Sequence, residues 1–165
     1  MTQKIAVVTG ASAGVGMAAA GMLLTKGWRV IGVGRTPDRC AHAAEALSGM
    51  GQFTMMQADL SDLTQVARVA DSVAAQVPYI NALPNNAGGV TAARMLTAQG
   101  HEGNFAGNHL APFLLTKKLL PLLRTGAETG GARVVAVSST GHEHCPGIRF
   151  DDLNFEQGFV GGAAY

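Results

Sequence analysis

Apolar and polar residues follow one another along this chain in a pattern that predicts strands and helices in turn. Continuous runs of apolar and β-branched residues recur at Ile5–Thr9, Arg29–Val33, Phe53–Gln57, Ile80–Leu83 and Arg133–Ser138. Between these runs lie longer segments in which apolar residues follow helical spacing. Apolar strands that alternate with helices are typical of a parallel sheet covered on both faces. The sequence therefore predicts one α/β domain over residues 1–165, with about five strands.

Three segments between these runs are expected to be helices. The clearest runs from Asp62 to Gln76, where apolar residues form one stripe. Ser61 is its predicted cap, and Asp62 suits the positive end of its dipole. A shorter, alanine-rich helix is predicted over Arg39–Leu47, and another from Met17 to Lys26.

Two prolines modify this pattern. A long helix is expected from about His101 to Leu123, and Pro112 inside it predicts a kink or a break. Pro84 follows the short run Ile80–Leu83 and has no N–H for a central strand. That strand is therefore expected to end early.

Composition and charge narrow the class of protein. The 165 residues are 47% apolar and only 14% charged, which favours a buried core over disorder. A formal charge of +1 offers no electrostatic argument for binding nucleic acid or an anionic membrane. No uninterrupted apolar stretch is long enough for a membrane span.

The cysteines and histidines suggest no metal site. Cys40 and Cys145 are far apart and lack metal-ligand spacing, so two free thiols in a reducing compartment are predicted, with the cytoplasm as the expected location. His142 and His144 lie beside Glu143, but their spacing matches no common metal pattern. A polar loop is the preferred interpretation, and no metal ligand is assigned.

A glycine-rich turn, Thr9–Gly16, joins the first strand to the first helix. Glycines at 10, 14 and 16 permit unusual backbone conformations and close approach of a ligand. The free N–H groups and the dipole of the following helix attract a phosphate, although a tight connection alone would look similar. The residues expected to hold a nucleotide pyrophosphate here are Gly10, Ser12, Ala13, Gly14, Val15 and Gly16.

Arg35 follows the second strand, where a dinucleotide-binding fold presents a side chain to the adenosine ribose. A carboxylate at this place would bind the ribose hydroxyls. A guanidinium instead suits a 2′-phosphate, by its charge and by its fork geometry. The alternative is a solvated surface arginine.

Polar residues also follow the later strands. Asp59 is placed to accept from an adenine amino group while Leu60 packs on the ring, although a simple helix-start acid would look the same. Asn86, Ala87 and Gly88 suit a backbone tied down close to a ligand, or an ordinary turn.

Ser139 ends the fifth strand, and ligands of open α/β sheets lie at such strand ends. Its hydroxyl is suited to bond a substrate oxygen. No Gly-x-Ser-x-Gly motif surrounds it, which argues against a hydrolase nucleophile.

Taken together, these positions resemble the short-chain dehydrogenase/reductase family. The ordered pieces are Thr9–Gly16, Asp59-Leu60, Asn85–Gly88, Asn108 and the strand ending in Ser139. The resemblance implies a Rossmann-type doubly wound sheet and an oxidoreductase that passes hydride between a nicotinamide cofactor and a carbonyl or alcohol substrate. With Arg35 at the ribose, NADP(H) is expected rather than NAD(H).

A closer resemblance is to the retinol-dehydrogenase-like branch. It rests on 97–102, on 108–116 and on the insert Phe150–Phe155, which in that branch lengthens the gap between the catalytic serine and tyrosine. The resemblance makes Tyr165 the proton donor and acceptor. It also implies that Ser139 orients the substrate oxygen and that Asn108 supports a proton relay.

The resemblance also implies that the chain is incomplete on its C-terminal side. The family's lysine, whose charge favours tyrosinate, would fall four positions beyond Tyr165. Little or no dehydrogenase activity is therefore expected, and the longer form is expected to be a homo-oligomer. Without a sixth strand, Arg133–Ser138 would be an exposed apolar edge that pairs with other chains.

A second interpretation is a non-catalytic dinucleotide-binding module, or pseudoenzyme, that acts through a protein partner. The residues encoded after Tyr165 would distinguish the two, since a lysine at the fourth position favours the enzyme and a stop codon favours the module. A P-loop phosphoryl-transfer protein is excluded, because no Gly-Lys-Ser/Thr follows the glycines.

Overall fold

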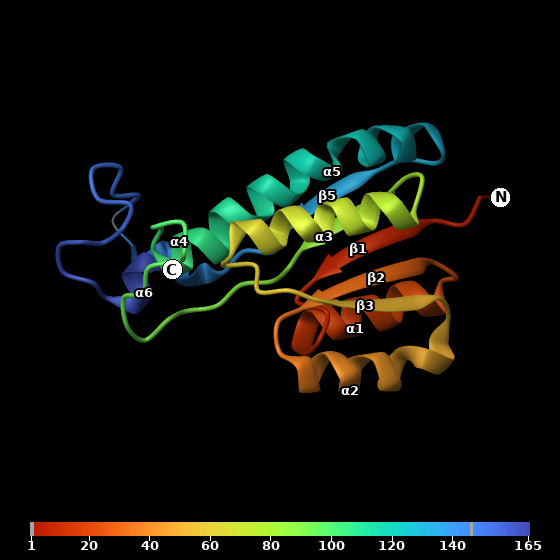
Figure 1. Cartoon of the computed structure of the whole chain (residues 1–165), viewed down its shortest axis with the longest axis horizontal. Coiled ribbons are helices and arrows are strands. Elements are labelled where there is room, and N and C mark those ends of the chain that lie inside the picture. Colours follow the sequence, from red (N-terminus) through yellow and green to blue (C-terminus); the bar gives the residue numbers. More distant parts are fainter. Residues whose placement is uncertain (1, 146) are drawn as a thin grey trace.

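The fold is built on one parallel sheet, seen in a computed structural model that describes residues 2–145 and 147–165 (Figure 1). The strands lie in the order β3-β2-β1-β4-β5, and every neighbouring pair is parallel. Their bounds are β1 (Ile5–Thr9), β2 (Arg29–Gly34), β3 (Phe53–Gln57), β4 (Ala82–Asn85) and β5 (Arg133–Ala136). This arrangement confirms the predicted α/β, Rossmann-type fold.

Helices cover both faces of the sheet (Figure 1). On one face lie α1 (Gly14–Thr25) and α2 (Pro37–Leu47), and on the other lie α3 (Leu63–Gln76) and α5 (Ala111–Glu128). The shorter helical turns are η1 (Ser48–Met50), α4 (Gly103–Phe105), η2 (Ala106–Leu110), η3 (Thr140–His144) and α6 (Gly161–Ala164). Among the described residues, no helix combines the length and apolarity needed to cross a bilayer.

The central strand β1 contributes to two apolar cores. Ile5 and Val7 belong to the cluster formed with α3 and α5, whereas Ala6 and Val8 belong to the cluster formed with α1 and α2. All five residues of β1 are buried, because successive side chains point to opposite faces and helices cover both. Burying one such valine or isoleucine is worth about 1.5–3 kcal/mol.

The prediction that the fourth strand ends before Pro84 is wrong. The strand begins at Ala82, two residues later than the apolar run, and continues through Pro84 to Asn85. Its register with β1 is limited to Ala6 opposite Ala82. Further along, the Thr9 side chain connects the two segments. Its hydroxyl donates to the carbonyl of Pro84 and accepts from the N–H groups of Asn86 and Ala87. On the other side of β4, Pro84 lies in register with Val135 of β5.

The predicted helix starts also need correction. The cap of α3 is Asp62 rather than Ser61, since the Asp62 carboxylate accepts from the N–H of Thr64. The expected helix over 101–123 runs from Gly103 to Glu128 in three pieces, of which the middle one, η2, is a π-helical turn. Pro112 stands in the first turn of α5, directly after this π-helical turn, so the helix is irregular next to the proline, where a kink or a break was predicted.

The edge strand β5 is short and exposed. It lies at one end of the sheet, as predicted, but ends at Ala136 rather than at Ser138. Val134, Val135 and Val137 are 46%, 47% and 51% exposed. An apolar strand edge is thus open to solvent in this chain.

Candidate functional site

The glycine-rich turn brings three backbone segments into close contact. Gly10 has a φ of +71°, and a side chain there would lie 2.7 Å from the Asn86 amide nitrogen. A side chain at Gly16 would collide with the carbonyl of Gly10 and with the same amide. Only glycine permits this packing, so these two glycines fix the shape of the turn.

The outer side of the turn is open. Gly14 has a φ of +54° with nothing within 4 Å of its missing side chain, and Val15 is 72% exposed. The first turn of α1 has no side-chain cap, and no described residue accepts from the N–H groups of residues 14–16. These donors at a helix N-terminus fit the phosphate group predicted from the sequence.

Thr9 fastens the loop after β4 to the end of β1. Its hydroxyl oxygen accepts from the N–H groups of Asn86 and Ala87, both at 2.9 Å. The Asn86 side-chain amide donates to the Thr9 carbonyl at 2.9 Å. Asn86 and Ala87 therefore lie beside the glycine turn, while Gly88 lies beside Asn108.

Arg35 lies at the exposed end of β2, next to the glycine turn. The N–H of Ala11 donates to the Val33 carbonyl at 3.0 Å, and Ser12 packs where Gly34 lacks a side chain. Arg35 is exposed, and no carboxylate of the described residues forms an ion pair with it. Its guanidinium is thus available to a ligand on the turn.

Asp59 and Leu60 lie between β3 and α3, both half-buried. One carboxylate oxygen of Asp59 accepts from the N–H and the hydroxyl of Ser61, at 2.9 and 2.8 Å. The Asp59 N–H donates to the side-chain oxygen of Gln65 at 2.9 Å. The residue therefore organises the start of α3, and its second oxygen makes no hydrogen bond to the described residues.

Asn108 lies in η2 and holds the loop after Gly88. Its side-chain oxygen accepts from the Gly89 N–H at 3.0 Å, and its nitrogen donates to the Gly89 carbonyl at 2.9 Å. Both polar atoms are therefore engaged with backbone.

Ser139 and Tyr165 meet at Gly141. The point where a Gly141 side chain would begin lies 3.5 Å from the Ser139 hydroxyl oxygen and 3.4 Å from the Tyr165 ring. Ser139 accepts from the Gly141 N–H at 3.1 Å, and Tyr165 is 47% exposed. The structure thus brings together two of the three predicted catalytic residues, while Asn108 is bound to Gly89 instead.

The comparison with known proteins agrees with this arrangement. The sequence profile of the family described as short chain dehydrogenase matches residues 4–148. The chain belongs to the short-chain dehydrogenase family. It is 35% identical to mouse retinol dehydrogenase 11 and 36% identical to human retinol dehydrogenase 14, over 98% and 96% of this chain. In each case the match covers 51% of the relative, so the chain spans about half the length of these proteins.

Solved structures share the fold of this chain. An uncharacterised protein from Mycobacterium paratuberculosis superposes with a TM-score of 0.85 at 35% identity, over 99% of this chain and 56% of its own. The RhlG/NADP active-site complex from Pseudomonas aeruginosa gives 0.74 at 33% identity, over 86% of this chain and 56% of its own. Oxidoreductase chemistry is therefore the chemistry of the chain's family.

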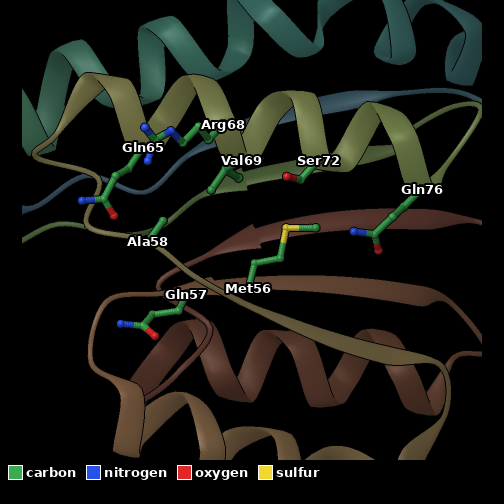
Figure 2. A pocket seen from close by; sticks show the side chains of 8 residues that line it. All are labelled: Met56, Gln57, Ala58, Gln65, Arg68, Val69, Ser72 and Gln76. Atoms are coloured by element: carbon green, nitrogen blue, oxygen red, sulfur yellow. The ribbon is translucent and has the colours of Figure 1, made fainter.

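A groove of about 400 Å³ lies between β3 and α3, and Gln65, which accepts from the N–H of Asp59, is among the residues that line it (Figure 2). Met56 of β3 and Ala58, which follows the strand, face Val69 and Ser72 of α3 across it, and Arg68 also lines it. None of the predicted cofactor or catalytic residues lines this groove. Its position therefore gives no support to a role in the family's chemistry.

Two residues that hold backbone N–H groups near the candidate site, Glu102 and Asn104, were not predicted from the sequence. Glu102 is fully buried, and its carboxylate caps α4 by accepting from the N–H groups of Asn104 and Phe105. Asn104 in turn accepts from the N–H of Thr91 at 2.9 Å. A carboxylate just before a helix was the available signal for Glu102, but nothing local connects Asn104 with Thr91.

The histidines and cysteines lie in ordinary surroundings. A ring nitrogen of His142 hydrogen bonds to the Ser139 carbonyl, and the His144 side chain lies outside the described part of the structure. Cys40 and Cys145 are free thiols, as predicted. Burial raises the pKa of the Cys40 thiol, so it is protonated at neutral pH.

Proposed function

We propose that this chain belongs to an NADP(H)-dependent oxidoreductase that transfers hydride between a nicotinamide cofactor and a carbonyl or alcohol substrate. The supporting observation is the open glycine turn, whose donors at residues 14–16 lack acceptors among the described residues. At the same ends of the parallel strands, Ser139 and Tyr165 converge on Gly141. Ligands of open α/β sheets bind at this side.

Each group has a distinct task in this proposal. The N–H groups at the start of α1 hold the pyrophosphate, and Arg35 pairs with the 2′-phosphate. Asp59 and Leu60 contact the adenine, while Asn86, Ala87 and Gly88 lie along the rest of the cofactor. The bound nicotinamide supplies or accepts the hydride. Ser139 donates to the substrate oxygen and Tyr165 exchanges its proton, with Asn108 supporting the proton relay.

The choice of NADP(H) is tested by Arg35→Ala. A charge-assisted pair with a phosphate is worth about 1.5–3 kcal/mol, so NADPH affinity should fall roughly 10- to 100-fold while NADH affinity stays the same. Nucleotide fluorescence titrations measure both. The matched control is Arg39→Ala, which removes another exposed arginine four residues away. An unchanged preference for NADPH in the Arg35 variant would exclude Arg35 as its cause.

Turnover separates the enzyme from the non-catalytic module. The family's lysine position lies beyond residue 165, so a polypeptide of residues 1–165 lacks the charge that favours tyrosinate. We expect it to bind NADPH but to reduce a panel of aldehydes roughly 100-fold or more slowly than a relative that contains the lysine. NADPH oxidation at the relative's rate would contradict this expectation. A non-catalytic module would stay inactive even in a longer polypeptide with a lysine four positions after Tyr165.

The substrate, location and assembly follow from the same proposal. The substrate is a small carbonyl compound or alcohol, and nothing in the charge of the chain favours nucleic acid. The two free thiols support the cytoplasm as the location. The longer form is proposed to be a homo-oligomer.

A further inference from the structure

The segment 149–157 forms a compact loop around one carboxylate. Asp152 accepts from the N–H groups of Glu156 and Gln157 at 2.7 and 3.2 Å, and Arg149 pairs with it at 2.9 Å. The Glu156 N–H chiefly, helped by Gln157 and Arg149, lowers the pKa of Asp152. The Arg149 guanidinium also lies 4.9 Å above the ring of Phe155. The loop is therefore held together by its own residues.

Asn154 fastens this loop to the segment before α4. Its side-chain oxygen accepts from the Glu102 N–H at 3.0 Å, and its nitrogen donates to the Gly100 carbonyl at 3.3 Å. Its own carbonyl accepts from Arg94 at 2.7 Å. The side chain of Asn154 thus bonds to the backbone of both Gly100 and Glu102.

The connection continues to Thr91 through buried side chains. Glu102 is 0% exposed and Asn104 is 2% exposed. The Glu102 carboxylate fixes the N–H of Asn104 at 3.0 Å, and the Asn104 side chain fixes the N–H of Thr91 at 2.9 Å. Hydrogen bonds therefore connect Asn154, through Glu102 and Asn104, to Thr91 in the loop after Asn86.

The helix α6 also packs closely against Thr91. A side chain at Gly161 would collide with the Thr91 carbonyl and would lie 3.4 Å from a methyl group of Val90. The N–H of Tyr165 donates to the Gly161 carbonyl at 3.1 Å. Neighbouring Gly162 has nothing within 4 Å of its missing side chain. Close approach at Gly161 therefore sets where α6 holds Tyr165.

We infer that Asn154 and Gly161 are positioning residues that act together through Thr91. They hold loop 86–91 in place on the nicotinamide side of the cofactor site and hold Tyr165 against that loop. The inference rests on the proposed function, which assigns the adenosine half to Arg35, Asp59 and the glycine turn. The two halves of the cofactor then depend on different parts of the chain.

The test compares two ligands, NADPH and adenosine 2′,5′-bisphosphate, which is the adenosine half alone. For Gly161→Ala and Asn154→Ala, NADPH affinity should fall roughly tenfold or more, because small misplacements at a site are costly. Affinity for the bisphosphate should stay within about twofold. Gly162→Ala is the matched control for the helix. Gln157→Ala is the control for the loop, since that side chain makes no hydrogen bond to the described residues.

Amide hydrogen exchange of the nucleotide-free protein gives a second measurement. Exchange over residues 86–91 should rise in Gly161→Ala and Asn154→Ala and stay unchanged in both controls. Equal losses for both ligands, or equal behaviour of the Gly161 and Gly162 variants, would overturn the inference. A parent protein that binds neither ligand would overturn the proposed function and the inference with it.

Discussion

The hydroxyl of Thr9 joins the two segments that would enclose a cofactor. It accepts from the N–H groups of Asn86 and Ala87 and donates to the carbonyl of Pro84. Thr9 is 2% exposed, so water cannot replace these bonds. Pro84, which lies opposite Val135 of β5, thus has its carbonyl bonded by the Thr9 side chain.

Thr9→Val should destabilise the protein by about 1–3 kcal/mol, because it leaves two backbone donors without an acceptor while keeping the side chain's shape. Urea unfolding measures the free energy. Thr25→Val is the control, since its exposed hydroxyl bonds only to Met22 within the same helix, and we expect less than about 0.5 kcal/mol there. Equal costs for both variants would show that the Thr9 bonds contribute nothing specific.

At the scale of elements, the start of α3 depends on Asp62. Its carboxylate accepts from the N–H of Thr64 and from the side-chain amides of Gln65 and Gln99. These hydrogen bonds, that of the Thr64 N–H first, lower the pKa of Asp62 below its ordinary value of 3.8. The ionised form is therefore favoured by folding.

A group whose pKa is depressed in the folded state stabilises it above the unfolded pKa. That stability is lost as the pH falls through the lower folded pKa. Asp62→Ala should therefore lower the thermal midpoint at neutral pH, and the difference from the parent should shrink below about pH 4. Asp151→Ala, which removes an exposed carboxylate with no hydrogen bond or ion pair to the described residues, is the control. A difference that does not change with pH would exclude the ionised cap as its origin.

The sequence identified the type and order of the main elements, because apolar periodicity is a local property. It placed the start of α3 one residue early and ended the fourth strand before Pro84. The first error is local, since the carboxylate of Asp62, and not the hydroxyl of Ser61, accepts from the N–H of Thr64. The second involves a residue far away in the sequence, since Thr9 bonds to Pro84 and Asn86.

At the scale of the whole molecule, the exposed strand β5 is the feature that favours self-association. Its valines face solvent at the end of the sheet, and its outer backbone groups offer a template for another strand. We expect a polypeptide of residues 1–165 to self-associate.

Val135→Lys should reduce that association, because a charge on an edge strand opposes pairing with a second copy. Light scattering over a range of concentrations measures the mean mass. Thr54→Lys places the same charge on β3, the opposite edge strand, and should leave the association unchanged. A monomeric parent protein would contradict the prediction.

The glycine turn with Arg35 and the region of Ser139 with Tyr165 were not equally predictable from the sequence. The glycine turn and Arg35 each directly follow a strand, β1 and β2, so a local pattern in the sequence was enough to propose them. That Ser139 and Tyr165 would both lie near Gly141 was expected only through family resemblance. The connection from Asn154 to Thr91 depends on side chains brought together by folding, and no local pattern reveals it.

The π-helical turn η2 has a consequence for how the chain can change. An α-helix advances about 100° per residue, so the residue gained in a wider turn shifts the angular phase of everything before it. Asn108 faces Gly89 while Leu115 and Leu119 face the core. Deleting one residue from Ala106–Leu110 would restore a regular helix and rotate the segment before it away from α5. We expect Leu115 and Leu119 to stay packed in the core, while the hydrogen bonds between Asn108 and Gly89 would be lost.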